Sequence, residues 1–351
     1  MEQPSIIRSG WWVALAAGGL SLAAGAVFVV PLLSRSPTTP GVVEFDLADV
    51  TVPRELVVRA MNPDGVMTLN GPAMVDAAEV DRFNSEERGK MLVSDDRVIG
   101  VEIAGDARAY PLRLMRWHEV VNDVIGGEAV AVTYSPLCDS VAVFDREVDG
   151  AEVELGVSGL LYNSNTLLYD RDSDRTASPL WVQLTGSPIS GGGPVPASPL
   201  RARPASLSTW ADWRALHPTT TVLAPLPEMK KPYKRDPFNS YFGSDLLRFP
   251  VEPLPPSGGP SLKDRVVIVT VHGESAVFAL NDLAETEGAP AGSTEVVVAG
   301  LPLRIRFDAA RHVADVEALT EPRRLESVRY SLWFAWFSLE GTIPGIIRGA
   351  T

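Results

Sequence analysis

The amino-acid sequence predicts a mainly β (α+β) protein, with antiparallel hairpins in two diverged internal repeats after an N-terminal transmembrane helix. Three observations support this fold class. The centre of the chain alternates apolar and polar residues with a period of two. Gly-Asp, Gly-Gly and Asp-Gly pairs separate the alternating runs, as is typical of hairpin turns. The 29 glycines and 29 prolines indicate many turns and few long helices.

The N-terminal region contains a long apolar run. After a short N-terminus, residues 1–9, no charged side chain occurs over residues 10–33. A bilayer core is crossed by about 20 apolar residues, whereas a cleaved signal has an apolar core of roughly 7–15. We therefore expect an uncleaved signal anchor at 10–33 that places a single-pass protein in the cell membrane. Arg8 and Arg35 flank the span evenly, so an extracytoplasmic main domain is the default orientation.

The rest of the chain divides into four predicted parts. Residues 34–42 form a polar, proline-containing linker. Residues 43–222 form the first β-rich unit, which includes an insertion at 156–206. A proline-rich loop, 223–260, joins this unit to a second β-rich repeat, 261–351, which lacks the candidate site described below.

Four pairs of segments recur in the same order and carry the prediction of a repeat. Both copies begin with a strand, a glycine-containing turn and a second strand that ends in leucine, and a helical turn is expected over 112–118. The pairs are 98–112 with 266–280, 126–134 with 292–300, 141–150 with 305–315, and 208–222 with 331–343.

The only cysteine, Cys138, lies in a Ser-Pro-Leu-Cys turn between two predicted strands. The Gly126-Gly127 turn sets a strand ladder which, when extended, places His118 opposite Ser135. A histidine beside a thiol stabilises the thiolate and lowers the thiol pKa. We therefore predict a redox site with Cys138 as the thiolate, His118 as its activator and Ser135 as a hydrogen-bonding neighbour.

The same residues suggest a soft-metal site. Cys138 and His118 would be ligands, with Met115 as a third, and copper(I) is the metal that best matches their softness. A purely structural role for both residues is the alternative to these two hypotheses. A lone cysteine is often simply buried, and His118 could be a hydrogen-bonded histidine of the core.

The insertion supplies candidates for a different function, a non-catalytic module that binds a ligand or a partner in the cell envelope. A polar cluster follows the Gly-Val-Ser-Gly run, and we expect Asp170 and Arg171 in that cluster to pair with each other. An aromatic and an amide side chain further along would line a pocket. The candidate binding residues are Tyr134, Asn163, Ser164, Asp170, Arg171, Trp181 and Gln183.

Composition excludes several classes of protein. A formal charge of −13 and a pI of about 4.9 argue against nucleic-acid binding, which requires a basic surface. A single cysteine excludes an internal disulfide and a cysteine-rich zinc site. The sequence has no P-loop, dinucleotide-binding fingerprint, His-Glu-x-x-His or nucleophile elbow. Whether the protein is an enzyme stays open, as does the identity of any redox or binding partner.

Four motifs carry a resemblance to a known family: YPLRLMRWHEVVND (110–123), VTYSPLCDSVAVFD (132–145), GVSGLLYNSNTLLYDR (156–171) and LWVQLTG (180–186). In this order they resemble the prokaryotic family called domain of unknown function 3179, over roughly residues 45–345. The family has no established activity. In its typical members the sequence of this turn resembles Cys-Pro-Leu-Cys, and some members are described as selenoproteins. The resemblance therefore implies a redox-active or metal-binding pair of cysteines.

This sequence departs from that pattern, because Ser135 occupies the position of the first cysteine. A disulfide within the turn is therefore excluded. The resemblance leaves monothiol chemistry, a Cys/His metal site, or a degenerate structural paralogue.

Overall fold

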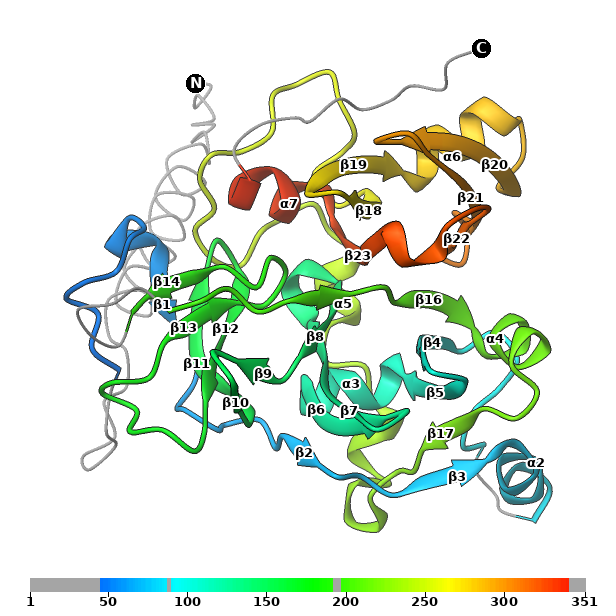
Figure 1. Cartoon of the computed structure of the whole chain (residues 1–351), viewed down its shortest axis with the longest axis horizontal. Helices are drawn as coiled ribbons and strands as arrows, with labels where there is room; N and C mark the ends of the chain where they lie inside the picture. The colour runs from blue at the N-terminus through cyan, green and yellow to red at the C-terminus, as the bar shows by residue number, and fades with distance from the viewer. Residues whose placement is uncertain (1–44, 87–89, 192–196, 341–351) are drawn as a thin grey trace, which may run out of the picture. The chain divides into compact units, whose positions relative to one another are not determined.

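The computed structural model describes residues 45–86, 90–191 and 197–340 (Figure 1). Of these residues, 41% lie in strands and 20% in helices, which confirms the mainly β prediction. The predicted anchor at 10–33 and linker at 34–42 lie outside the described residues. No helix within the described part of the chain is long and apolar enough to cross a membrane.

The first large sheet has the order β19-β18-β23-β8-β7-β6-β2, and β15 pairs beside β8. Most of its pairs are antiparallel; β2 with β6 is parallel. Its strands are β2 (Leu69–Asn70), β6 (Val120–Ile125), β7 (Glu128–Ser135), β8 (Ser140–Asp145), β15 (Ala202–Arg203), β18 (Arg265–Val271), β19 (Glu274–Ala279) and β23 (Leu325–Leu332).

The second large sheet has the order β20-β21-β22-β16-β4-β5-β17-β3. Its strands are β3 (Met74–Asp76), β4 (Arg97–Ile103), β5 (Asp106–Pro111), β16 (Ser206–Thr209), β17 (Thr221–Leu223), β20 (Ala291–Val298), β21 (Leu301–Asp308) and β22 (Val313–Ala318).

A smaller sheet, β1-β11-β12-β13-β14, comes mostly from the predicted insertion. We call its strands β11 to β14 the inserted sheet. The bounds are β1 (Val57–Arg59), β11 (Leu155–Tyr162), β12 (Asn165–Asp170), β13 (Leu180–Val182) and β14 (Pro188–Ser190), and a separate ribbon pairs β9 (Glu147–Val148) with β10 (Ala151–Glu152).

Short helices connect the strands. The α-helices are α2 (Ala77–Glu86), α3 (Leu112–His118), α4 (Trp210–Leu216), α5 (Asn239–Phe242), α6 (Leu280–Glu287) and α7 (Trp333–Glu340). The 3-10 turns are η1 (Arg54–Leu56), η2 (Pro136–Cys138), η3 (Pro227–Met229), η4 (Pro232–Lys234) and η5 (Pro322–Arg324). The predicted helical turn at 112–118 is therefore confirmed, and the 223–260 loop contains three short helical segments.

The two halves of the chain are interleaved. From β4 and again from β18, the chain forms a hairpin, a helix, a second hairpin and a further strand. One large sheet joins β6, β7 and β8 to β18, β19 and β23, and the other joins β4, β5 and β16 to β20, β21 and β22. In the first large sheet the halves meet at Tyr330 with Val141 and at the isolated bridge of Pro204 with Val328, and in the second they meet at Leu207 with Ala314. Strands from 43–222 and 261–351 therefore share both sheets.

The same backbone hydrogen bonds occur in both halves. The N–H of Trp210, at the start of α4, donates to the carbonyl of Asp96 at 2.8 Å. The N–H of Trp333, at the start of α7, donates to the carbonyl of Asp264 at 2.7 Å. Each aspartate precedes the arginine that opens β4 or β18, so helix and strand are joined in the same way in both places.

Two of the four predicted segment pairs differ from the correspondence that the order of the strands gives. Residues 98–112 and 266–280 cover the same elements, and the described residues 331–340 match the strand end and helix of 208–216. Residues 126–134 cover β7, whereas 292–300 cover β20, which matches β6 in strand order. Strand β21 corresponds to β7 in chain order, so the turn at 309–312, between β21 and β22, corresponds to the turn at 136–139 that contains Cys138.

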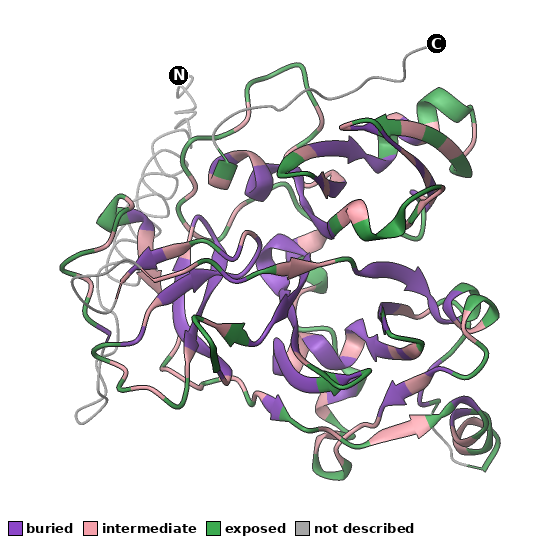
Figure 2. Ribbon diagram, viewed as in Figure 1, coloured by how far each residue is buried: buried purple, intermediate pink, exposed green. Residues whose placement is uncertain are grey.

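The two large sheets pack face to face around one core. Ile99 of β4 shares a hydrophobic cluster with Val132 of β7 and Val267 of β18. The inserted sheet covers the opposite face of β6 to β8, where Phe144 and Trp181 belong to another cluster. Strands β7 and β8 are consequently covered on both faces and almost entirely buried (Figure 2).

Candidate functional site

The cysteine turn is a short 3-10 segment between β7 and β8. Pro136 opens it, and Asp139 ends it with a left-handed φ of 42° before β8 begins. Cys138 is fully buried and packs with Leu332 and Phe334 of the second half of the chain. The turn therefore lies inside the protein, although a proline turn between strands usually lies at the surface.

Burial raises the pKa of the Cys138 thiol to about 12. Hydrogen bonds with Asn165 and Ser135 act in the opposite direction, and the carboxylate of Asp139 adds to the increase. Because desolvation penalises the charged thiolate most, Cys138 is a neutral thiol at neutral pH.

The predicted pairing of His118 with Ser135 is wrong. The β6–β7 ladder begins at Val120 with Thr133, and His118 is the last residue of α3. Glu119 has a φ of 56°, which turns the chain sharply between helix and strand. Nδ1 of His118 lies 2.7 Å from the carbonyl oxygen of Met67, and Nε2 lies 2.5 Å from the hydroxyl of Tyr233. Burial lowers the pKa of His118.

The proposed metal ligands occupy different surroundings. Met115 is fully buried in the main core, among the apolar side chains of the two large sheets. Cys138 belongs to a separate cluster beside α7. Among the described residues, no three or more His, Cys, Asp or Glu side chains are grouped so that they could hold a metal ion.

A buried polar chain begins at Glu119. Its Oε2 lies 3.0 Å from Oγ1 of Thr166, which lies 3.1 Å from Oγ of Ser135. The backbone N–H of Thr166 also donates to Ser135 at 3.1 Å. The threonine hydroxyl donates towards both Glu119 and Ser135, so these two acceptors share its single proton.

Burial favours the protonated, neutral form of Glu119. Glu119 is completely desolvated, and burial raises its pKa to about 7, while the hydrogen bond from Thr166 opposes the increase. A carboxyl group that titrates near neutrality beside a cavity is a frequent feature of functional sites. Glu119 is not among the site residues predicted from the sequence, where its only signal is a charged residue directly before the apolar Val120–Val121 pair.

The polar chain continues on the other side of Ser135. Nδ2 of Asn165 donates to Oγ of Ser140 at 3.1 Å, and Ser140 donates to Oε1 of Gln183 at 2.6 Å. Nε2 of Gln183 donates to Thr133 at 2.8 Å. The inserted sheet thus supplies amide side chains that satisfy buried hydroxyls of β7 and β8.

A cavity of about 190 Å³ reaches this chain from outside. Its inner end is polar, its walls are apolar, and the exposed Arg248 lies at its rim. Cys138 does not line it, whereas Ser135 does. The polar lining residues are Glu119, Ser135 and Thr166, and the apolar ones include Met61, Val157, Leu160, Leu161, Phe238 and Phe249.

Beside the cavity, Asp139 holds the two halves of the chain together. Its carboxylate accepts from Arg97 at 3.1 Å, Arg265 at 2.7 Å and the hydroxyl of Tyr134 at 2.7 Å. Burial opposes ionisation of Asp139, but the two arginines and the tyrosine hold its pKa well below the usual range. Arg97 and Arg265 open β4 and β18, the corresponding strands of the two halves.

The other predicted binding residues brace the fold. Asn163 bonds both backbone groups of Glu252 and donates to the carbonyl of Ser338. Ser164 donates to the carbonyl of Phe249 at 3.4 Å, and the indole of Trp181 donates to the carbonyl of Ser198 at 3.0 Å.

The predicted pair between Asp170 and Arg171 is wrong. Arg171 pairs with Glu154 at 2.8 Å and Asp64 at 3.3 Å. Asp170 accepts the backbone N–H of Glu154 instead. Asp170 is the last residue of β12 and Arg171 directly follows it, and the two side chains have different partners.

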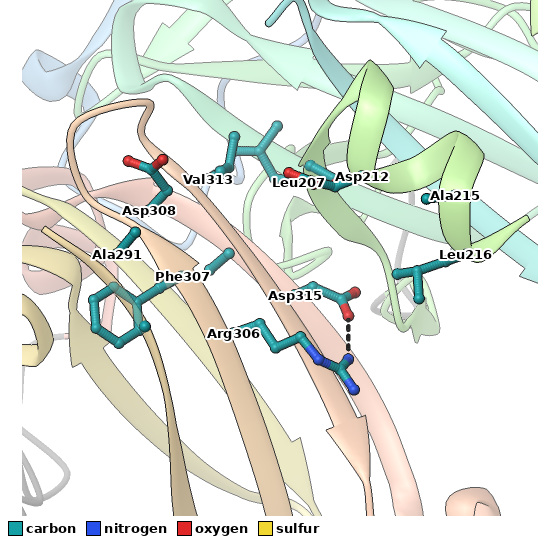
Figure 3. Close-up of a pocket in the computed structure, with 13 residues that line it drawn as sticks. Leu207, Asp212, Ala215, Leu216, Ala291, Arg306, Phe307, Asp308, Val313 and Asp315 are labelled. Atoms are coloured by element: carbon teal, nitrogen blue, oxygen red, sulfur yellow. Dashed lines mark hydrogen bonds and ion pairs between the residues drawn. The ribbon is translucent and has the colours of Figure 1, made fainter. Parts of the chain in front are cut away.

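Two larger hollows lie elsewhere. A groove of about 490 Å³ lies between α4 and the β20–β22 strands (Figure 3). A cleft of about 670 Å³ is lined by residues of β15, β18 and β23. Neither contains Cys138 or Glu119.

The fold and the site together define a mainly antiparallel β protein with a small, partly polar cavity closed by an inserted sheet. A family profile described as "Protein of unknown function (DUF3179)" matches residues 64–341. The chain therefore belongs to this family, and the resemblance in the sequence is confirmed. No curated protein and no solved structure matches the chain significantly.

Proposed function

We propose that this protein is a ligand-binding module of the cell envelope, which takes a small, mainly apolar molecule into the cavity that ends at Glu119, Ser135 and Thr166. The observation that carries the proposal is the cavity itself, since apolar walls converge on three buried polar groups. Binding pockets typically combine an apolar lining with a few fixed polar groups.

The polar end favours a ligand with a hydrogen-bond acceptor. Below neutral pH the carboxyl group of Glu119 carries a proton that it can donate, because its pKa is raised to about 7. The hydroxyl of Ser135 is held by the backbone N–H of Thr166. A carbonyl or hydroxyl oxygen of the ligand would replace the contact between Glu119 and Thr166.

The test measures binding of three probes, benzamide, benzoate and cyclohexanol, to the full-length protein in detergent. Ligand-observed NMR detects the binding. Leu161→Trp fills the cavity and should abolish binding of the best probe. Ser135→Ala removes one polar group and should weaken binding about tenfold. Ser293→Ala, at an exposed strand position of the second half, should have no effect. Failure of every probe to bind, or unchanged binding by Leu161→Trp, would reject the proposal.

A monothiol or copper(I) site at Cys138 is a second candidate, and one observation favours it. Ser135 is hydrogen-bonded to the thiol and also lines the cavity. Because its pKa is raised, the Cys138 thiol is neutral at neutral pH and is a poor nucleophile and metal ligand. This favours the ligand-binding function over a thiol or copper site. Stoichiometric copper(I) binding that disappears in Cys138→Ala and requires His118 would reverse this preference.

We also propose that residues 10–33 anchor the protein in the cell membrane with the described domain outside the cytoplasm. The support is the apolar run without charge. Deletion of residues 1–33 should release the protein into the soluble fraction, and protease added to intact spheroplasts should digest the full-length domain. Protection from the protease would reverse the orientation.

We infer further that the two halves are diverged copies of one ancestral unit. The matching order of elements and the matching hydrogen bonds of Trp210 and Trp333 support this inference. Alignment of the two halves across many family members should pair β4 with β18 and β7 with β21. Any other register in that alignment would contradict it.

A further inference from the structure

A cleft on the outer side of the first large sheet has an unusual charge. The cleft, of about 670 Å³, lies where β15, β18 and β23 meet, and its lining includes four arginines and one glutamate. The whole protein carries a formal charge of −13. The lining arginines are Arg201, Arg203, Arg323 and Arg329, and the glutamate is Glu326.

Two of these arginines are partly neutralised. Asp145 pairs with Arg201 at 3.4 Å and also with Arg203, which contacts Glu128 as well. Arg323 is exposed beside them. A guanidinium has five N–H donors in a flat fork, so one carboxylate leaves further donors available.

Arg329 is the central group of the cleft. Its residue is only 7% exposed. It donates to two neutral groups, the carbonyl of Leu184 at 3.2 Å and the hydroxyl of Thr270 at 3.1 Å. Its Nε is buried and has no hydrogen-bond partner among the described residues. A buried charged group without a full set of partners is costly unless something else satisfies it.

The surroundings of Arg329 also disfavour its positive charge. Burial lowers the pKa of Arg329, and the carboxylate of Glu340 acts in the opposite direction. The guanidinium also lies over the ring of Trp336, 5.5 Å from its centroid. This cation–π contact and the two hydrogen bonds restrict the movement of the Arg329 side chain, so less conformational entropy remains to be lost when an anion binds.

We propose that this cleft binds a multivalent oxyanion, a phosphate ester or a di- or tricarboxylate, through Arg329 and Arg323. Oxyanions match the guanidinium fork with paired, charge-assisted hydrogen bonds. Arg201 and Arg203 extend the same cationic rim. This site is separate from the cavity at Glu119, since the two share no lining residue, so either can exist without the other.

The phosphate could come from a soluble molecule or from a lipid headgroup, and the experiment separates the two sources. One arm titrates pyrophosphate and citrate into the full-length protein in detergent by calorimetry, with sodium chloride at matched ionic strength as reference. The other arm measures co-sedimentation with vesicles of phosphatidylcholine that contain phosphatidic acid. Saturable binding in either arm is expected, and the arm in which it occurs identifies the source.

Variants tie the binding to the cleft. Arg323→Gln should weaken binding about tenfold, the loss expected for one charge-assisted hydrogen bond. Arg329→Lys keeps the charge but loses the fork and should weaken binding further. Arg82→Gln, at an exposed arginine of α2, is the matched control and should bind as the parent protein does. Binding in neither arm, or equal loss in Arg82→Gln and Arg323→Gln, would overturn the proposal.

Discussion

Two turns of the same length lie at corresponding places in the two halves of the chain. One follows β7 and contains Cys138; the other follows β21 and contains Arg311 in the same position. In both, the last turn residue is left-handed, with a φ of 42° at Asp139 and 61° at His312. The first turn is buried throughout, whereas the side chain of Arg311 is 53% exposed.

The inserted sheet accounts for this difference. Every residue of β8 is buried, because one face meets the main core and the other meets β11 to β13. Strand β21 has the alternating pattern of a strand with one open face. The two turns have a similar backbone conformation, but only the cysteine turn is buried. The burial of Cys138, and with it the raised pKa of its thiol, is therefore due to the segments that cover the turn.

The open groove of the second half shows the same contrast. In the first half, Gln183 of the inserted sheet bonds Thr133 and Ser140 of β7 and β8. At the places in β21 and β22 that correspond to Thr133 and Ala142, Arg306 and Asp315 pair with each other at 3.3 Å (Figure 3). No inserted sheet follows β22, which leads to β23 through a short connection.

The largest expected effect concerns the residues that end the two turns. Asp139→Ala should lower the free energy of unfolding by about 3–5 kcal/mol, since it leaves Arg97 and Arg265 buried without their carboxylate. His312→Ala should change it by less than about 0.5 kcal/mol, as is usual at exposed positions. Urea denaturation of both variants at pH 7 is the measurement. Equal effects would show that the two turns are not differently braced.

The pH dependence follows from the direction of the pKa shift. The pKa of Asp139 is lower in the folded protein than in the unfolded chain, so its contribution is fully present above the unfolded pKa of about 3.9. It is lost as the pH falls below that value. The loss is complete only when the pH falls through the lower, folded pKa. The difference between Asp139→Ala and the parent protein should therefore shrink steadily from pH 5 to pH 2, and a difference that stays constant over this range would indicate a cause other than charge.

The second prediction compares thiols at the same position of the two turns. Cys138 should react with iodoacetamide about a thousandfold more slowly at pH 8 than an ordinary thiol, because it is buried and its pKa is raised to about 12. Arg311→Cys in a Cys138→Ala background should react at the ordinary rate. Fast reaction of Cys138 that slows in His118→Ala would instead support a thiolate site.

Glu119 gives the third prediction. Its pKa is raised to about 7 in the folded state, so its contribution to stability is complete below the unfolded pKa and is lost as the pH rises towards 7. Glu119→Gln should remove this dependence and be more stable than the parent at pH 8 by about 3 kcal/mol. Thermal unfolding from pH 4.5 to 8 checks it. Glu295→Gln, an exposed control, should keep the parent profile.

Local features were predictable from the sequence. The Gly126-Gly127 turn predicted the pairing of Ile125 with Glu128, and this pairing is confirmed. The spacing of apolar residues predicted the helix at 112–118, which is also confirmed. Such elements depend on neighbours within a few residues, so the pattern contains the information that determines them.

The site depended on distant partners that no local pattern encodes. His118 contacts Met67 and Tyr233, which lie 51 and 115 residues away in the sequence. The ladder that should have placed His118 beside Ser135 stops at Val120, two residues short of His118, because the chain turns at Glu119, which has a positive φ. Of the predicted residues, Cys138, Ser135 and Gln183 do lie in one polar network, and Glu119, which was not selected, opens that network to the cavity.

The smallest expected effect concerns the last turns of α4 and α7. Leu216 and Leu339 occupy the same place in these helices, six residues after the first tryptophan. Leu339 packs against the inserted sheet, in the clusters of Leu180 and Leu184, whereas Leu216 is 53% exposed at the edge of the open groove. Leu339→Ala should cost about 1–2 kcal/mol, below the range for a fully buried leucine, and Leu216→Ala about 0.5 kcal/mol or less.

Urea denaturation resolves a difference of this size only when both variants unfold with the same dependence on denaturant. A loss of more than about 1 kcal/mol in Leu216→Ala would mean that a segment outside the described residues covers the groove. The groove would then be occupied in both halves, and the inserted sheet could no longer be the reason why only the cysteine turn is buried.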